Sequence, residues 1–256
     1  MRGYRSAQPY VPYFHLRAEI CSETLIEEMA EFGPEDRIGI VSLMDHTPGQ
    51  RQFADLSQMK TYLQGKYAMS DADVMDHFEL LRRVKAQHGE ANESAAVAKA
   101  LSYGSVIASH DDTTRDHVIQ SAEYGVRLAE FPTTIDAAKA CHEAGIAVMM
   151  GAPNLLRGGS HSGNVAASEL MDAGLLDIMS SDYAPASLLM SGVKLGEETG
   201  NMAVGIRAVT KAPAQAAKLN DRGEIALGLR ADLVRFTHID AFPRTRGVWV
   251  QGTRVA

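Results

Sequence analysis

A repeated pairing of a short apolar run with an amphipathic stretch constrains the fold of this chain more than any other feature. Continuous apolar strands that alternate with helices are typical of a parallel sheet covered on both faces. The apolar runs lie at 13–20, 38–46, 105–112, 126–132, 146–154 and 175–183, and each ends in polar residues or in Gly and Pro. The chain is therefore predicted to form an α/β fold with six strand–helix units.

The polar ends of these strands favour one particular α/β architecture. In a (β/α)₈ TIM barrel the chemistry lies at the carboxyl ends of the strands. Six units fall short of a closed barrel, and an open doubly wound sheet would also accept six strands. From Asp221 onward the sequence instead predicts short strands separated by turns. We therefore expect an incomplete barrel domain over 1–220, with a helix pair near 59–100, and a small C-terminal β module over 221–256.

Charge and composition exclude several classes of protein. The chain carries 25 Lys and Arg against 32 Asp and Glu, a net charge of −7, so a generally basic surface for nucleic acid is not expected. The sequence contains no apolar run long enough to span a membrane and no apolar leader near its start. With only Cys21 and Cys141, a disulfide framework is excluded, and we expect a cytoplasmic protein.

Histidines and carboxylates at the strand ends predict a metal centre. Imidazole and carboxylate groups are ligands that suit Zn²⁺, Mn²⁺ or Fe²⁺, and strand ends converge in a barrel. A single histidine after an apolar strand is usually an ordinary, partly buried residue, but two histidines with carboxylates in one register favour a metal site. The strand-end residues are Glu19, Asp45, His46, His110, Asp111, Asp112, Glu130, Asn154 and Asp182.

The loop at 151–168 is predicted to bind an anion. Glycines free its backbone, Arg157 supplies a charge, hydroxyl and amide side chains add donors, and a helix follows directly. A flexible surface loop is the alternative. The substrate-binding residues expected here are Asn154, Arg157, Gly159, Ser160, His161 and Asn164.

Two further arginines are candidate anion contacts. Arg51 lies close to His46 in the sequence, where the start of a capped helix is an equally good interpretation. Arg17 shares a strand face with Glu19 and with His15, whose role stays open. The remaining histidines, His77, His88, His117, His142 and His238, are predicted to be surface or structural residues.

The motifs taken together resemble the amidohydrolase superfamily and, within it, the diphosphatases of phosphonate metabolism. Seven segments in order carry the resemblance: FHLRAEI, MDHTPGQRQF, ASHDDTT, EFPTT, GAPNLLRGGSHSGN, SSDYAPASLL and GLRADLV. The resemblance implies one or two divalent ions, Zn²⁺ or Mn²⁺, held by His46, His110 and Asp182, with Glu19 at an early strand. Asp182 is also implied to be the general base.

The resemblance also implies a reaction and its partners. The reaction is hydrolysis of a ribose 1-phosphonate 5-triphosphate to the 5-phosphate and diphosphate, within the carbon–phosphorus lyase pathway, whose other proteins are candidate partners. The His-x-His or His-x-Asp pair that the family carries on its first strand is not found, so the chain resembles the C-terminal two-thirds of such an enzyme. We expect it to dimerise or aggregate through open sheet edges and to have little diphosphatase activity on its own. The alternatives are an amide hydrolase or deaminase, and an inactive paralogue that acts as a binding subunit.

Overall fold

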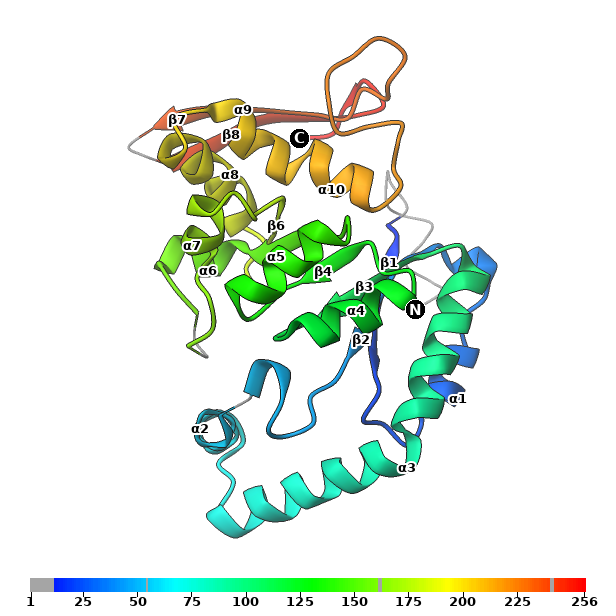
Figure 1. The fold of residues 1–256 in the computed structure, drawn as a ribbon. Helices are drawn as coiled ribbons and strands as arrows, with labels where there is room; N and C mark the ends of the chain where they lie inside the picture. Colours follow the sequence, from blue (N-terminus) through cyan, green and yellow to red (C-terminus); the bar gives the residue numbers. More distant parts are fainter. Residues whose placement is uncertain (1–11, 54, 161–162, 240–241) are drawn as a thin grey trace.

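Six parallel strands form one sheet in which each strand pairs with the next along the chain (Figure 1). The computed structural model describes residues 12–53, 55–160, 163–239 and 242–256. The strands are β1 (Phe14–Glu19), β2 (Ile38–Met44), β3 (Val106–His110), β4 (Leu128–Glu130), β5 (Ala147–Gly151) and β6 (Ile178–Ser180). A doubly wound sheet reverses its strand order at a switch point, whereas a barrel adds each strand beside the last. The unbroken order from β1 to β6 confirms the incomplete-barrel prediction.

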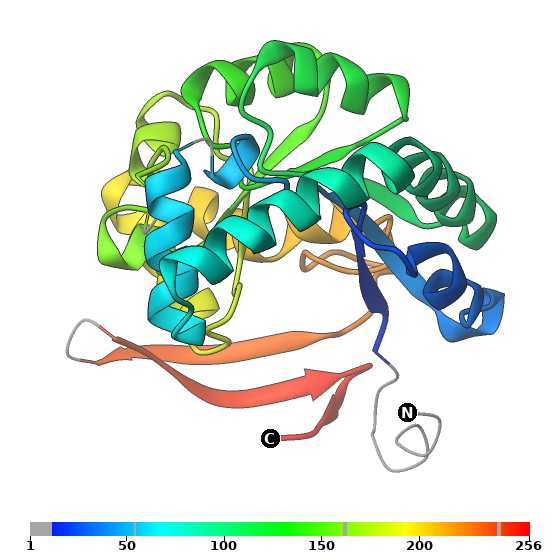
Figure 2. The same cartoon turned by 90° about the horizontal axis from the view of Figure 1, so that it is seen from below.

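Helices connect the strands and cover the sheet. They are α1 (Leu25–Ala30), α2 (Leu56–Tyr67), α3 (Asp71–Tyr103), α4 (Arg115–Glu123), α5 (Ile135–Glu143), α6 (Ala152–Arg157), α7 (Ala167–Asp172), α8 (Ser187–Glu198), α9 (Met202–Val209) and α10 (Lys211–Ala216), with short 3₁₀ turns at Pro34–Asp36 and Arg51–Phe53. The predicted helix pair between β2 and β3 consists of α2 and α3, which cross each other (Figure 2). None of the described helices, including the 33-residue α3, has the length and apolarity needed to cross a bilayer.

Local sequence explains where the long helix α3 begins and ends. The Ser70 side chain accepts a hydrogen bond from the amide of Asp73, and the Asp73 carboxylate accepts one from the amide of Ser70. This capping box satisfies amides that have no partner within the helix. Gly104 ends the helix in the left-handed conformation, with φ of 68°, which glycine adopts without a steric cost. Strand β3 then begins two residues later, which fixes the position of His110.

Both faces of the sheet are buried at β3 and β4, where successive side chains point to opposite faces and every residue is buried. Ile107 joins the large apolar cluster between the sheet and its covering helices. Its neighbours Val106 and Ala108 join a smaller cluster on the other face, together with Ala212 of α10. This two-sided burial explains why the strands read as continuous apolar runs in the sequence.

A small antiparallel sheet follows the helices. It contains β7 (Leu233–Ile239), β8 (Phe242–Val250) and β9 (Thr253–Arg254), and helix α8 contacts both β6 and β8. The expectation of strands from Asp221 is wrong over 221–232, which form turns without strands. Ion pairs hold these turns instead: Arg222 contacts Asp221 and Asp232, and Arg230 contacts Asp232. The domain boundary at 220 stays a prediction.

Both cysteines are buried, and burial raises the pKa of the Cys21 and Cys141 thiols to about 12. A thiol with a raised pKa is protonated, and therefore unreactive, at about pH 8. We expect no alkylation of the native protein by iodoacetamide at this pH, and modification of both thiols in denaturant, measured by intact mass. Rapid single alkylation of the native chain would contradict the burial of one of them.

Candidate metal centre and cleft

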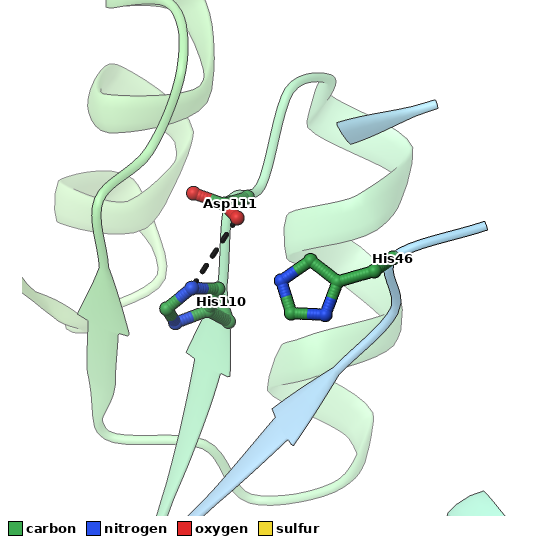
Figure 3. Close-up of side chains that lie close together, drawn as sticks. All are labelled: His46, His110 and Asp111. Atoms are coloured by element: carbon green, nitrogen blue, oxygen red, sulfur yellow. Dashed lines mark ion pairs between the residues drawn. The ribbon is translucent and has the colours of Figure 1, made fainter. Parts of the chain in front are cut away.

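His46, His110 and Asp111 converge at the carboxyl end of the sheet. Strands β2 and β3 are parallel neighbours, so the residues that follow them lie side by side. A ligand-type atom from each of the three residues lies within 4.8 Å of the other two. Figure 3 shows the two imidazoles and the carboxylate directed at one another. Two imidazoles and a carboxylate form a donor set that suits Zn²⁺ or Mn²⁺.

A carboxylate from a neighbouring strand holds each imidazole through its Nδ1 atom. His46 Nδ1 donates to Glu19 at the end of β1, and His110 Nδ1 lies 3.0 Å from Glu130 Oε2 at the end of β4. Such carboxylate–histidine pairs fix ring orientation and leave Nε2 for a metal ion. Burial alone would lower the pKa of His46, but the hydrogen bond and charge of Glu19 raise it overall. Glu130 therefore has a role that sequence reasoning missed, although its position at a strand end was the available signal.

The buried carboxylate of Asp111 provides a test of whether a cation fits this site. Burial raises the pKa of Asp111 more than the nearby His110, His46 and Arg51 lower it. A carboxylate in this situation lacks sufficient positive charge around it, and a divalent ion is the group that would supply it. The residues present thus fit a metal ion. Asp111 is one of the strand-end residues that the sequence singles out, and the structure places it in the ligand cluster itself.

Three residues that follow strands adopt left-handed backbone conformations at this end of the sheet. The φ angles are 55° at Asp111, 57° at Phe131 and 48° at Asp182. For a bulky residue such as Phe131 this conformation is rare. Its ring meets the His110 ring edge to face, with 5.3 Å between the centroids. The turns after β3, β4 and β6 thereby aim these side chains at the cleft.

A cleft of about 1220 Å³ lies above the metal-ligand cluster, between the sheet and the helices α2 and α3. Asp182 lines this cleft but lies outside the cluster formed by His46, His110 and Asp111. Gly151 makes room for it, because a Cβ there would lie 3.1 Å from Asp182 Oδ2. The predicted residues that line the cleft are Arg17, Glu19, His46, His110, Asn154, Arg157, Ser160, Asn164 and Asp182. The histidine His77, expected at the surface, also lines it.

The loop expected to bind an anion is built differently from the prediction. The helix that follows, α7, does not offer its first amides to a ligand: Asn154 Oδ1 accepts from the amide of Ala167, and the Glu169 carboxylate accepts from that of Ala166. The expected cradle of helix amides is therefore wrong at these two positions. Arg157 contacts the hydroxyl of Tyr183, and its Nη2 lies 3.5 Å from the carbonyl oxygen of Gly159. His161 lies outside the described residues.

Arg51 lies behind the site rather than in it. Its Nη1 donates to the carbonyl oxygen of His110 and to Asp112 Oδ1, both at 2.8 Å, and it is not among the residues that line the cleft. The charge of Arg51 thus braces the turn after β3, an arrangement that does not favour the expected anion contact. Arg17 does line the cleft, and its Nε lies 3.1 Å from Met44 Sδ.

His15, whose role the sequence left open, lies beneath the ligand cluster. Its Nε2 is 2.5 Å from Ser42 Oγ and 3.2 Å from Glu130 Oε1. Burial lowers the pKa of His15, although the charge of Glu130 raises it in part. His15 is thus a neighbour of the carboxylate that orients His110, one step removed from the cluster.

Fold and site together define a barrel-type α/β protein with an imidazole–carboxylate cluster at the carboxyl ends of its strands. The chain is 45% identical over 244 residues to the alpha-D-ribose 1-methylphosphonate 5-triphosphate diphosphatase of Escherichia coli (strain K12). The match covers 94% of this chain and 65% of that protein, so the chain spans less than two thirds of its relative. The resemblance inferred from the seven motifs is thereby confirmed. No family model matches the chain.

Comparison with a solved structure gives evidence about the fold but not about function. The crystal structure of an uncharacterized protein superposes with a TM-score of 0.60 at 16% sequence identity. The superposition covers 95% of this chain and 68% of the other. The architecture thus extends over nearly the whole chain.

Proposed function

We propose that this chain carries the metal-binding and phosphate-binding residues of a diphosphatase that cleaves ribose 1-phosphonate 5-triphosphates to the 5-phosphate and diphosphate. The observation that carries the proposal is the presence, in one cleft, of the His46–His110–Asp111 cluster and the two arginines Arg17 and Arg157. The 45% identical relative is named for that reaction. An amide hydrolase is less favoured, because two cationic side chains in the cleft suit an anionic substrate better than a neutral amide.

The chemistry divides between a metal ion and the chain's own residues. A divalent ion, Zn²⁺ or Mn²⁺, would be held by His46, His110 and Asp111 and would lower the pKa of a bound water toward about 7. Asp182, at the cleft wall, would accept a proton from the attacking water. The water oxygen bonds to the ribose-proximal phosphorus, and the bond from that phosphorus to the bridging oxygen breaks, so diphosphate leaves with the electron pair. Arg17 and Arg157 would bind the charged oxygens.

Glu19 and Glu130 would contribute by orientation. Each accepts a hydrogen bond from an imidazole Nδ1, which keeps Nε2 directed to the ion. Glu19 lines the cleft as well, so a second ion beside His46 is compatible with its position. The number of ions, one or two, is a proposal that metal analysis of the purified protein decides.

The test is ³¹P NMR of the purified protein with Zn²⁺ or Mn²⁺ and a ribose 1-methylphosphonate 5-triphosphate. We expect free diphosphate and a 5-phosphate monoester to appear slowly at the expense of the triphosphate signals, and a chelator to stop the reaction. Release of orthophosphate alone would contradict the proposed position of cleavage. Hydrolysis of cyclic amides or nucleobases would favour the amide hydrolase, and metal binding without turnover would favour the binding subunit.

Other partners follow from the same proposal. The substrate is a phosphorylated small molecule, and the acidic net charge of −7 gives no reason to expect nucleic acid or a membrane as a partner. Contacts with other proteins of the carbon–phosphorus lyase pathway, self-association and a cytoplasmic location stay predictions.

A further inference from the structure

One face of the long helix α3 lies against the turns that carry Glu19 and His46. Lys85, Gly89 and Asn92 are spaced by four and three residues, so they share one face of the helix. Gly89 and Asn92 are buried, and Ala96 and Ala100 continue the same stripe into the core. We call Lys85, Gly89 and Asn92 the α3 stripe.

Asn92 holds the turn that follows Glu19. Its Nδ2 donates to the carbonyl oxygens of Ile20, at 3.0 Å, and Ser22, at 2.6 Å. The side chain is 3% exposed, so these bonds are formed away from water. Within the same turn the amide of Cys21 lies 3.3 Å from Glu19 Oε1. The position of the Glu19 carboxylate therefore depends on a turn that α3 braces.

Lys85 holds the turn that contains His46. Its Nζ lies 2.9 Å from Oδ2 of the buried Asp45, the residue directly before His46. The other oxygen, Asp45 Oδ1, accepts hydrogen bonds from the amide and hydroxyl of Thr47, at 3.0 and 2.6 Å. Asp45 thus clamps the backbone on both sides of His46, and Lys85 neutralises its buried charge. The imidazole itself is oriented by Glu19, so Asp45 and Lys85 act on the backbone of this turn.

Gly89 leaves room for the Lys85 side chain. A Cβ at position 89 would lie 2.5 Å from Lys85 Cδ and 3.0 Å from Cε. Alanine at this position would therefore push the lysine chain off the helix surface and away from Asp45. The change alters no charge and leaves the backbone hydrogen bonds of α3 intact.

We propose that the α3 stripe is a positioning device: Lys85, Gly89 and Asn92 hold the turns of Glu19 and His46 at the spacing that a metal ion requires. The inference rests on the metal site of the proposed function. The stripe connects helix α3, which lines the cleft, to the ends of strands β1 and β2 through contacts that lie outside the cleft. Residues of this kind affect metal affinity without touching the metal ion or the substrate.

Gly89→Ala and Lys85→Met test the proposal. We expect each variant to bind Zn²⁺ or Mn²⁺ about 10–100-fold more weakly than the parent in a chelator competition. The thermal midpoint of metal-free Gly89→Ala should fall only modestly, because the helix propensity of alanine offsets part of the cost of separating Lys85 from the buried Asp45. In the metal-free protein the His46 imidazole NMR signals should move, while those of His142, at the other end of the sheet, should not.

Two further variants sharpen the comparison. Arg83→Met removes an exposed charge from the same helix and should match the parent in every measurement. Lys85→Arg restores a cation beside Asp45 and should recover most of the metal affinity. In the diphosphatase assay, Gly89→Ala should lose activity at limiting metal and regain it when metal is saturating, with KM for the triphosphate unchanged.

Each result separates the positioning role from the proposed function. Parental metal affinity and unmoved His46 signals in both Gly89→Ala and Lys85→Met would overturn the positioning role. A weaker affinity that unfolding of the metal-free variants at the assay temperature accounts for in full would also overturn it, because the stripe would then serve folding alone. If the parent bound metal but did not hydrolyse the triphosphate, the proposed function would fail while the affinity and NMR shifts still supported the stripe.

Discussion

Replacing His110 with alanine is expected to weaken the binding of Zn²⁺ or Mn²⁺ by more than about 100-fold and to abolish hydrolysis of the triphosphate. Loss of a residue that merely orients a ligand costs about 10–100-fold, and loss of the ligand itself should exceed that range. The change also leaves Glu130 without its hydrogen-bond partner at Oε2 in a buried position. Metal content by mass spectrometry and diphosphate release measure the two effects.

His238→Ala is the matched control. This histidine lies in β7, in the small sheet, and its Nε2 lies 3.6 Å from Glu197 Oε1. Its removal should leave metal content and turnover at the parental level. If His110→Ala retained both the metal and the activity, the His46–His110–Asp111 cluster would have to be abandoned as the metal centre.

Gly205→Ala is expected to destabilise the fold more than any single change at the cleft. Helices α8 and α9 cross at three glycines, and a Cβ at Gly205 would lie 2.0 Å from the carbonyl oxygen of Gly192 and 2.4 Å from the amide nitrogen of Gly196. These are backbone atoms, so the helices themselves must separate. Overpacking of this kind costs about 3 kcal/mol at the upper end of its usual range. The thermal midpoint should fall by roughly 6–12 °C, measured by circular dichroism.

Gly65→Ala provides the comparison for that measurement. Gly65 lies in helix α2, and a Cβ there would meet no atom within 4 Å. Alanine should therefore keep or raise the thermal midpoint through its helix propensity, by at most about 1 kcal/mol. Equal midpoints for the two variants would show that α8 and α9 do not cross at van der Waals contact of their backbones.

The strand pattern was predictable because burial on two faces leaves a strong record in the sequence. Strands β2 to β6 are mostly apolar, and polar residues at or just after the strand ends, such as His46 and His110, line the cleft. The segment 221–232 misled the interpretation because its apolar residues are not buried. Ile225 is 89% exposed, and the ion pairs of Arg222 and Arg230 hold the segment in turns. Apolar letters alone do not distinguish such a segment from a strand.

The site was predictable only as far as strand ends converge. His46 and His110 were expected as a pair because parallel neighbours end at the same edge, and the structure brings them together. The selection of Asp111 depends on its left-handed φ of 55°, which turns the side chain back toward His110. The position of the Arg51 side chain depends on its hydrogen bond to Asp112, which is 61 residues away in the sequence. Neither backbone handedness nor long-range pairing is recorded in local residue spacing.

The left-handed residues at the ends of β3, β4 and β6 give the cleft a thermodynamic cost. Asp111, Phe131 and Asp182 each adopt a left-handed backbone conformation that costs an L-residue about 1–2 kcal/mol. Glycine would remove this cost at all three positions. Glycine would also delete a cluster carboxylate, the ring against His110 and the cleft-wall carboxylate. Selection for thermal stability alone would therefore favour glycine at these three positions, at the expense of the site. At these three positions a substitution that raises the stability of the fold would also remove a side chain that the site uses.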